Sequence, residues 1–122
     1  MSVPTMKKLT VFVPARDFAL SRAFYEAMGW RCAFATDDVA SMVSDAGSFL
    51  LQDFYEKALA ENLMLRIDVD DADAWAAHVR GLVAEGRFPG VRVMDTRDEP
   101  WGDRVTYVVD PSGVLLHLAQ AR

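Results

Sequence analysis

The sequence predicts an α+β fold in which two βαβββ modules form a curved mixed sheet around a cavity. One observation leads to this fold. The stretch from about residue 8 to 55 and the stretch from about residue 63 to 120 each show a strand pattern, a helix pattern and three further strand patterns, in that order. A second observation concerns length. Neither stretch is long enough to bury its own helix and sheet, so the two are expected to pack together as a single domain over residues 1–122.

The first module begins with a predicted strand over residues 9–13, where apolar and polar residues alternate. The run Pro14-Ala15-Arg16-Asp17 then opens a helix, because aspartate is a favourable N-cap residue. Apolar residues within 19–28 lie on one helical face, and Gly29 ends that helix. Three short strands are expected after it, over residues 30–36, 39–44 and 48–54.

The second module follows a connector, residues 55–62, that has room for a short helical turn. Residues 63–69 alternate as a strand, and apolar residues from Ala72 to Val83 share one face of a helix that ends at Gly86. We interpret the acidic cluster at this point as a strand end and a helix N-terminus, not as a calcium loop; it consists of Asp68, Asp70, Asp71 and Asp73. The last strands are expected over residues 91–96, 104–109 and 114–119.

Composition argues against several classes of protein. Eighteen acidic and thirteen basic residues give a net charge of −5, whereas a nucleic-acid-binding surface needs a basic face. No apolar run approaches the ~18 residues of a membrane span, and residues 1–8 lack the apolar core of a secretory signal. We therefore expect a cytoplasmic protein without nucleic-acid or membrane partners. The single cysteine, Cys32, cannot form an intrachain disulfide and is expected to be a small buried hydrophobic residue.

The most informative motif lies near the C-terminus. Between two aliphatic runs, Asp110-Pro111-Ser112-Gly113 combines an Asx side chain, a fixed proline φ and a flexible glycine, which predicts a β-hairpin turn. This hairpin, an aspartate at each helix entry and the helix phrase ending in Phe24-Tyr25 resemble the vicinal-oxygen-chelate superfamily. That superfamily includes glyoxalase I, extradiol dioxygenases, fosfomycin-resistance enzymes and bleomycin-resistance proteins. The resemblance covers nearly all of the chain and implies paired modules around a cavity.

In the metal-dependent members of that superfamily, His, Glu and Gln ligands lie on four strands. The resemblance places Thr10, Gln52, Met64 and His117 at the corresponding positions of this sequence. Only the His117 imidazole is a good ligand for a divalent ion, and the Gln52 amide is an occasional one, whereas a hydroxyl and a thioether are poor ligands. We therefore expect no tightly bound metal and no cofactor, and a weak metal site at Gln52 and His117 stays open.

The stretch from Pro14 to Phe18 and the pair Trp101-Gly102 resemble bleomycin-resistance proteins, which are acidic homodimers without the metal ligands. The resemblance implies a first strand that crosses to a partner subunit at a hinge near Pro14. It also implies antibiotic resistance by sequestration, in which a small molecule is held in a cavity or dimer groove and no bond is broken. Strand alternation and the resemblance together predict the residues that line this site: Phe12, Gln52, Phe54, Met64, Arg66, Trp101 and His117.

Other interpretations of these residues stay open. His117 can be a barrel-lining residue hydrogen-bonded to Thr10 or Gln52, and Arg66 can either anchor a ligand carboxylate or phosphate or pair with Asp68. The alternative functions are a divergent glyoxalase-like lyase or isomerase and an interaction module whose cavity is filled by side chains. No catalytic residue is assigned, because the sequence contains no nucleophile elbow and no nucleotide-binding motif.

Overall fold

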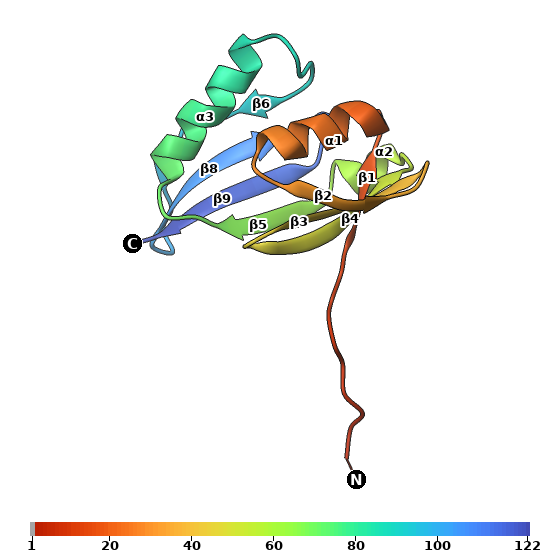
Figure 1. The fold of residues 1–122 in the computed structure, drawn as a ribbon. Coiled ribbons are helices and arrows are strands. Elements are labelled where there is room, and N and C mark those ends of the chain that lie inside the picture. Colours follow the sequence, from red (N-terminus) through yellow and green to blue (C-terminus); the bar gives the residue numbers. More distant parts are fainter. Residues whose placement is uncertain (1) are drawn as a thin grey trace.

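The computed structural model describes residues 2–122 and confirms an α+β fold with strands and helices in both halves of the chain (Figure 1). The helices are α1 (Phe18–Ala27), α2 (Lys57–Ala60) and α3 (Ala72–Ala84). The strands of the first half are β1 (Phe12–Ala15), β2 (Arg31–Ala35), β3 (Val39–Ser44) and β4 (Gly47–Asp53). The strands of the second half are β5 (Met64–Asp68), β6 (Arg92–Val93), β7 (Arg97–Asp98), β8 (Asp103–Val109) and β9 (Leu115–Ala121).

The strands form two mixed sheets, one from each half of the chain, which we call sheet A and sheet B. In sheet A the order is β1-β4-β3-β2, with β1 parallel to β4. In sheet B the order is β5-β9-β8-β6, with β5 parallel to β9 and β7 paired to β8. Because β5 takes the place of β1 and the other strands follow in the same order, the two halves repeat one βαβββ arrangement, as the sequence predicts.

Both long helices begin at an aspartate. Asp17 Oδ1 accepts a hydrogen bond from the Leu20 backbone N–H at 3.1 Å, and Asp71 Oδ1 accepts one from Ala74 at 3.0 Å. Asp73 lies in the first turn of α3, where negative charge meets the positive end of the helix dipole. The acidic cluster therefore starts α3, as predicted. Within residues 2–122, no helix is long and apolar enough to cross a membrane.

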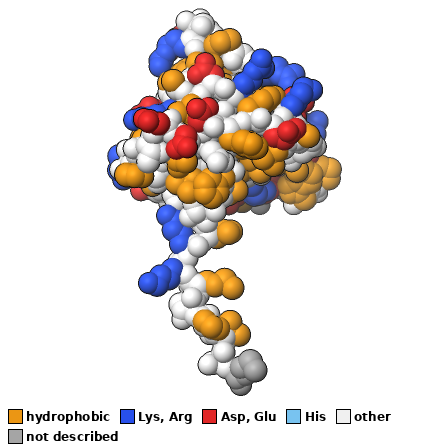
Figure 2. Space-filling view, turned by 90° about the vertical axis from the view of Figure 1, so that its right-hand side faces the viewer, with side chains coloured by type: hydrophobic (Ala, Val, Ile, Leu, Met, Phe, Trp, Pro, Cys, Tyr) orange, Lys and Arg blue, Asp and Glu red, His pale blue; other side chains and the backbone are white. Residues whose placement is uncertain are grey.

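The first strand begins later than the sequence predicts, because β1 starts at Phe12 and residues 2–11 form an extended arm that leaves the body of the protein. Figure 2 shows hydrophobic and lysine side chains along this arm. Val11 O accepts a hydrogen bond from Leu50 N, but residues 2–10 make no backbone hydrogen bond to the rest of the described chain. The prediction that Thr10 belongs to a strand is therefore wrong for this chain alone, which provides no neighbouring strand for it.

The strand predicted over residues 91–96 is divided into β6 and β7. Val93 pairs with Val108 and Arg97 pairs with Val105. Between these two pairs the chain advances four residues from β6 to β7 but only three residues along β8. One extra residue on the outer side interrupts the ladder, as in a β-bulge. The interruption matters for function because β7 leads into the turn that carries Trp101.

The buried core takes side chains from both halves. Phe24 of α1, Val79 of α3 and Leu116 of β9 are all fully buried in one cluster. The His78 Nε2 atom on α3 lies 2.8 Å from the Ala27 carbonyl oxygen of α1, which links the two helices directly. The helices cover one face of the sheets, and the opposite face is open to solvent (Figure 1). Along β4 and β5 the side chains therefore alternate between more buried and more exposed positions.

A buried polar contact joins α1 to the closing hairpin. The Tyr25 hydroxyl donates a 2.6 Å hydrogen bond to Asp110 Oδ2, and Asp110 Oδ1 accepts from the backbone N–H groups of Ser112 and Val114. Burial raises the pKa of Tyr25 well above its ordinary value, and the negative charge of Asp110 raises it further. Burial also raises the pKa of Asp110, against the effect of its hydrogen bonds. The helix phrase that ends in Phe24-Tyr25 and the hairpin turn at Asp110, which both carry the family resemblance, are therefore in direct contact.

We predict that Tyr25→Phe lowers the free energy of unfolding by about 2 to 3 kcal/mol, because it removes the only side-chain hydrogen bond that the buried Asp110 carboxylate accepts within residues 2–122. Urea unfolding followed by circular dichroism measures this change. The matched control is Tyr55→Phe, whose hydroxyl makes no hydrogen bond within residues 2–122 and whose loss should change stability by less than about 0.5 kcal/mol. Equal losses in both variants would contradict the prediction.

We also predict a pH dependence that belongs to Tyr25. Above a pH of about 10 the unfolded chain loses this phenolic proton, whereas the folded chain keeps it because its pKa is raised. The folded state then binds more protons than the unfolded state, so the free energy of unfolding falls as pH rises through this window. The stability difference between the natural chain and Tyr25→Phe should therefore shrink from pH 9 toward higher pH, and a constant difference would speak against the assignment.

Candidate functional site

The open face of sheet B is organised in rows of side chains that run across the strands. The pairing register of neighbouring strands places one residue from each strand in a row. The side chains of successive rows on this face lie about 7 Å apart along a strand. The first row contains Arg92, Val109, Leu115 and Met64, and the second contains Tyr107, His117 and Arg66. Apolar, aromatic and basic side chains therefore share this one face.

A cavity of about 630 Å³ lies on this face and brings together three of the predicted ligand-binding residues, Met64, Trp101 and His117. We call it the Trp101 cavity. The side chains of Met64 and Trp101 are each 61% exposed, which is high for large apolar groups. The other lining residues are Met94, Asp95, Arg97, Glu99, Tyr107 and Leu115. The cavity thus offers aromatic and thioether surface next to carboxylates.

The imidazole of His117 packs edge-on against the ring of Tyr107, with 4.8 Å between the ring centroids. Its Nε2 atom is buried and has no hydrogen-bond partner within residues 2–122. Burial lowers the pKa of His117, and the positive charge of Arg66 lowers it further, so the ring is mainly neutral at pH 7. A hydrogen bond from His117 to Thr10 or Gln52 is not formed, because Thr10 lies in the arm and Gln52 in sheet A.

Arg66 lies on the same face but is already paired. Its guanidinium contacts Asp68 at 2.9 Å and Asp103 at 2.7 Å, and Asp103 also accepts a 3.1 Å hydrogen bond from Trp101 Nε1. The hydrogen bond from Arg66 is the main cause that lowers the pKa of Asp103. Arg66 therefore acts on the cavity through Asp103, which holds the indole of Trp101 in place.

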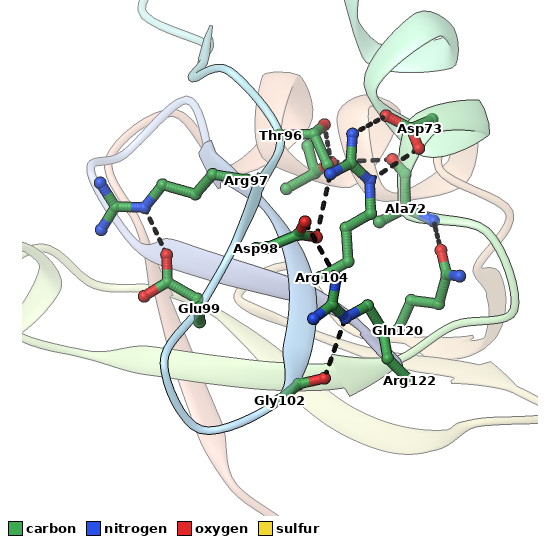
Figure 3. A network of polar contacts seen from close by, with 11 residues as sticks. Ala72, Asp73, Thr96, Arg97, Asp98, Glu99, Gly102, Arg104, Gln120 and Arg122 are labelled. Carbon is green, nitrogen blue, oxygen red and sulfur yellow. Dashed lines mark hydrogen bonds and ion pairs between the residues drawn. The ribbon is translucent and has the colours of Figure 1, made fainter.

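The turn that carries Trp101 is held by a network of ion pairs (Figure 3). Arg104 forms two bonds of 2.9 Å with Asp73 of α3 and a third of 3.0 Å with Asp98 of β7. Arg122 contacts Asp98 at 2.9 Å, and Arg97 pairs with the buried carboxylate of Glu99. These contacts tie β7 to α3 and to the C-terminal end of the chain. They fix both ends of the segment that displays the indole.

Of the remaining predicted residues, Phe12 lies in β1, Gln52 in β4 and Phe54 directly after β4, and none of them lines the Trp101 cavity. Phe12 pairs in register with Leu50 and is 53% exposed, so it lies on the open face of sheet A. Phe54 is also exposed, and Gln52 is partly buried. The structure therefore divides the predicted site into two parts, one on each sheet.

Phe34 is an exposed aromatic residue that alternation from the sequence misses. The pairing of β2 with β3 shifts between Cys32 and Phe34, so that Phe34 pairs with Ser41 and not with Ala40. The extra residue turns the Phe34 side chain onto the open face of sheet A, where it is 64% exposed. No turn residue marks this irregularity in the sequence, so strand periodicity could not have found it.

The side chains at the superfamily's metal-ligand positions do not fit a metal in this chain. Met64 and His117 lie in sheet B, Gln52 lies in sheet A, and Thr10 lies in the arm. Within the part of the chain that the structure describes, no group of three or more His, Cys, Asp or Glu side chains is arranged to hold a metal ion. One imidazole and one amide on different sheets do not provide the convergent, charge-balancing ligands that a divalent ion requires.

Comparison with known proteins agrees with this fold. A bleomycin resistance protein from Klebsiella pneumoniae is 28% identical over 112 residues, which cover 88% of this chain and 87% of that protein. A bleomycin-binding protein solved in complex with bleomycin has a TM-score of 0.77 at 22% identity, and the match covers 96% of this chain and 100% of that one. An antibiotic binding protein from Streptomyces, TnmS3, also has a TM-score of 0.77 at 22% identity, with 98% and 100% covered. A family model matches residues 8–118, and the chain therefore belongs to the Glyoxalase/Bleomycin resistance protein/Dioxygenase superfamily.

Proposed function

We propose that this protein binds and sequesters an amphipathic, cationic antibiotic of the bleomycin class and breaks no bond in it. The observation that carries the proposal is the exposed indole of Trp101 at the mouth of a cavity of about 630 Å³. Trp101 shares this cavity with the exposed side chains of Met64 and Met94, and a contiguous exposed apolar patch beside a cavity marks a site where a ligand or partner binds. A relative named for bleomycin resistance and solved structures named for binding bleomycin or an antibiotic support an antibiotic as the ligand.

The charge of the protein favours a cationic ligand. The chain carries a net charge of −5, and Asp95 and Glu99 line the Trp101 cavity beside the indole. Asp95 pairs with Arg80 at 3.3 Å and Glu99 pairs with Arg97, so a cation near the indole gains mainly from the ring quadrupole and from the net negative charge of the protein. Arg97 is the basic residue of this cavity, and its guanidinium is held by Glu99.

We propose further that the binding unit is a homodimer. The arm, residues 2–11, exposes Val3, Met6 and Leu9, and the Leu9 side chain is 92% exposed. An extended segment with unpaired backbone groups and apolar side chains is suited to pair with a strand of another chain. Lys7 and Lys8 give the arm a positive charge, which complements an acidic partner copy. Such an exchange begins at Val11, where pairing within the chain stops, and not at Pro14.

In this dimer the two parts of the predicted site, one on each sheet, would contact the same ligand. Phe12 and Phe34 present aromatic surface from sheet A, and Trp101 presents it from sheet B. A planar ligand group that is stacked between the two surfaces would be removed from water on both sides, which neither sheet achieves alone. We also propose that the whole chain is one domain in a reducing, cytoplasmic compartment, for which the shared core and the free thiol of Cys32 are the supporting features.

We predict that Trp101→Ala weakens bleomycin binding by about 1 to 3 kcal/mol, because a central stacking contact is lost. Isothermal titration calorimetry is the suitable measurement, since Trp30 and Trp75 also contribute to fluorescence. Phe34→Ala should weaken binding in the same direction. Leu59→Ala removes an exposed apolar side chain on α2, outside the Trp101 cavity, and should leave affinity unchanged. Heat release that is equal in all of these proteins, or absent in all, would refute the proposed function.

A second prediction concerns the dimer. Light scattering of the natural chain at micromolar concentration should give about twice the chain mass of 13.6 kDa. The double variant Met6→Ser and Leu9→Ser should shift the equilibrium toward the monomer, because the arm loses the apolar side chains that a partner would bury. The control is Val83→Ser, which changes an exposed apolar residue of α3. A natural chain that stays monomeric across the concentration series would exclude the exchange.

A further inference from the structure

A second cavity, of about 480 Å³, lies where the segment between β1 and α1, the residues that flank α2, the closing hairpin and β6 meet. Its lining includes the arginines Arg16 and Arg92, the ring of Tyr55, and the apolar side chains of Val109 and Leu115. Arg92, Val109 and Leu115 belong to the first row of sheet B, so this cavity opens on the same face as the Trp101 cavity. We call it the two-arginine cavity.

The two guanidinium groups differ from most others in this protein because they are not paired. Within residues 2–122, neither Arg16 nor Arg92 forms a side-chain hydrogen bond or an ion pair. By contrast, seven other arginines each contact a carboxylate; these are Arg22, Arg66, Arg80, Arg87, Arg97, Arg104 and Arg122. In a chain of net charge −5, two unpaired cations in one cavity are a distinctive feature.

Arg16 is held in position by its surroundings. Its backbone N–H donates a 2.9 Å hydrogen bond to Ser112 Oγ, across 96 residues. Its guanidinium carbon lies 5.7 Å from the centroid of the Tyr55 ring, within the range of a cation–π contact. Arg92 is fixed differently, by strand pairing of β6 with Val109. Both cations are therefore presented from ordered backbone.

The carboxylate that lines this cavity does not cancel their charge. Glu61 belongs to the lining, but its Oε1 atom lies 3.4 Å from Lys57 Nζ, which pairs with it. The cavity therefore keeps an excess of positive charge. A guanidinium is planar and offers two parallel N–H donors, a geometry that suits the oxygens of a phosphate or carboxylate.

We propose that the two-arginine cavity binds an oxyanion, a phosphate monoester or a carboxylate, carried on a small apolar or aromatic body. The anion contacts Arg16 and Arg92, and the body packs on Tyr55, Val109 and Leu115. The volume of the cavity exceeds what a bare phosphate ion fills, and a bare ion would leave the apolar walls of the cavity in contact with water. The site requires neither Trp101 nor a second chain, so it can be tested separately from the proposed antibiotic binding.

The test uses phenyl phosphate and inorganic phosphate as probes, titrated into the full chain by calorimetry at constant ionic strength. Phenyl phosphate should bind saturably, and at least tenfold more tightly than inorganic phosphate. Arg16→Gln and Arg92→Gln should each weaken phenyl phosphate binding about tenfold or more. Arg16→Lys should weaken it less than Arg16→Gln, because it keeps the charge and loses the planar donors.

Arg31→Gln is the matched control, because Arg31 is also an exposed arginine without an ion pair in the described chain, but it lies on β2 outside the cavity. This variant should bind phenyl phosphate as the natural chain does. An equal loss in Arg31→Gln would show only general electrostatic attraction and overturn the proposal. Equal affinities for the two probes would overturn the apolar part of it.

The same variants separate this site from the proposed function. Trp101→Ala should leave phenyl phosphate binding unchanged, and Arg92→Gln should still fold with the natural melting temperature in the absence of probe. If phenyl phosphate fails to bind while bleomycin binding still depends on Trp101, the oxyanion site alone is refuted. If phenyl phosphate binds and depends on Arg16 and Arg92 while bleomycin does not bind, the proposed antibiotic binding fails and the oxyanion site stands.

Discussion

The hydrogen bond from Tyr25 to Asp110 is the contact on which the arrangement of the two modules depends. It connects the first helix to the last turn, through a carboxylate that also orders the turn backbone. An unpaired carboxylate in this place would be costly, so the hydroxyl of α1 must reach the hairpin whenever the fold is complete. The shared core is thereby built from both halves, and the open sheet faces are left on the outside, where ligands and partners have access.

The chemistry of those faces follows from how their charges are paired. Around the Trp101 cavity each arginine has a carboxylate partner, and the partners hold the indole and its turn in place. At the other end of the face, Arg16 and Arg92 are left without such partners. A single surface thus has a region suited to cations and aromatic groups and a region suited to oxyanions, and the side chain of Leu115 lines both.

The elements of the fold could largely be predicted from sequence, because helix caps, strand alternation and the hairpin turn are local signals. Strand alternation placed Met64 and His117 on one face, where the structure has them, whereas Trp101 was predicted from the family resemblance. Local patterns could not show that residues 9 and 10 lack a neighbouring strand in the described chain, since pairing depends on a distant segment. They also could not show that a bulge turns Phe34 outward, or that Arg16 and Arg92 meet across 76 residues in one cavity.

The separation of Tyr25 and Asp110 by 85 residues has a consequence for how the chain is made. During synthesis the first module emerges long before the hairpin that accepts its buried hydroxyl. Until that hairpin arrives, α1 has an unsatisfied polar group and an apolar face without its full covering, so the N-terminal half is expected to stay loosely packed. Folding is then limited by a long-range closure that must wait until residues 110–114 have been synthesised, and the nascent chain needs protection from aggregation until that moment.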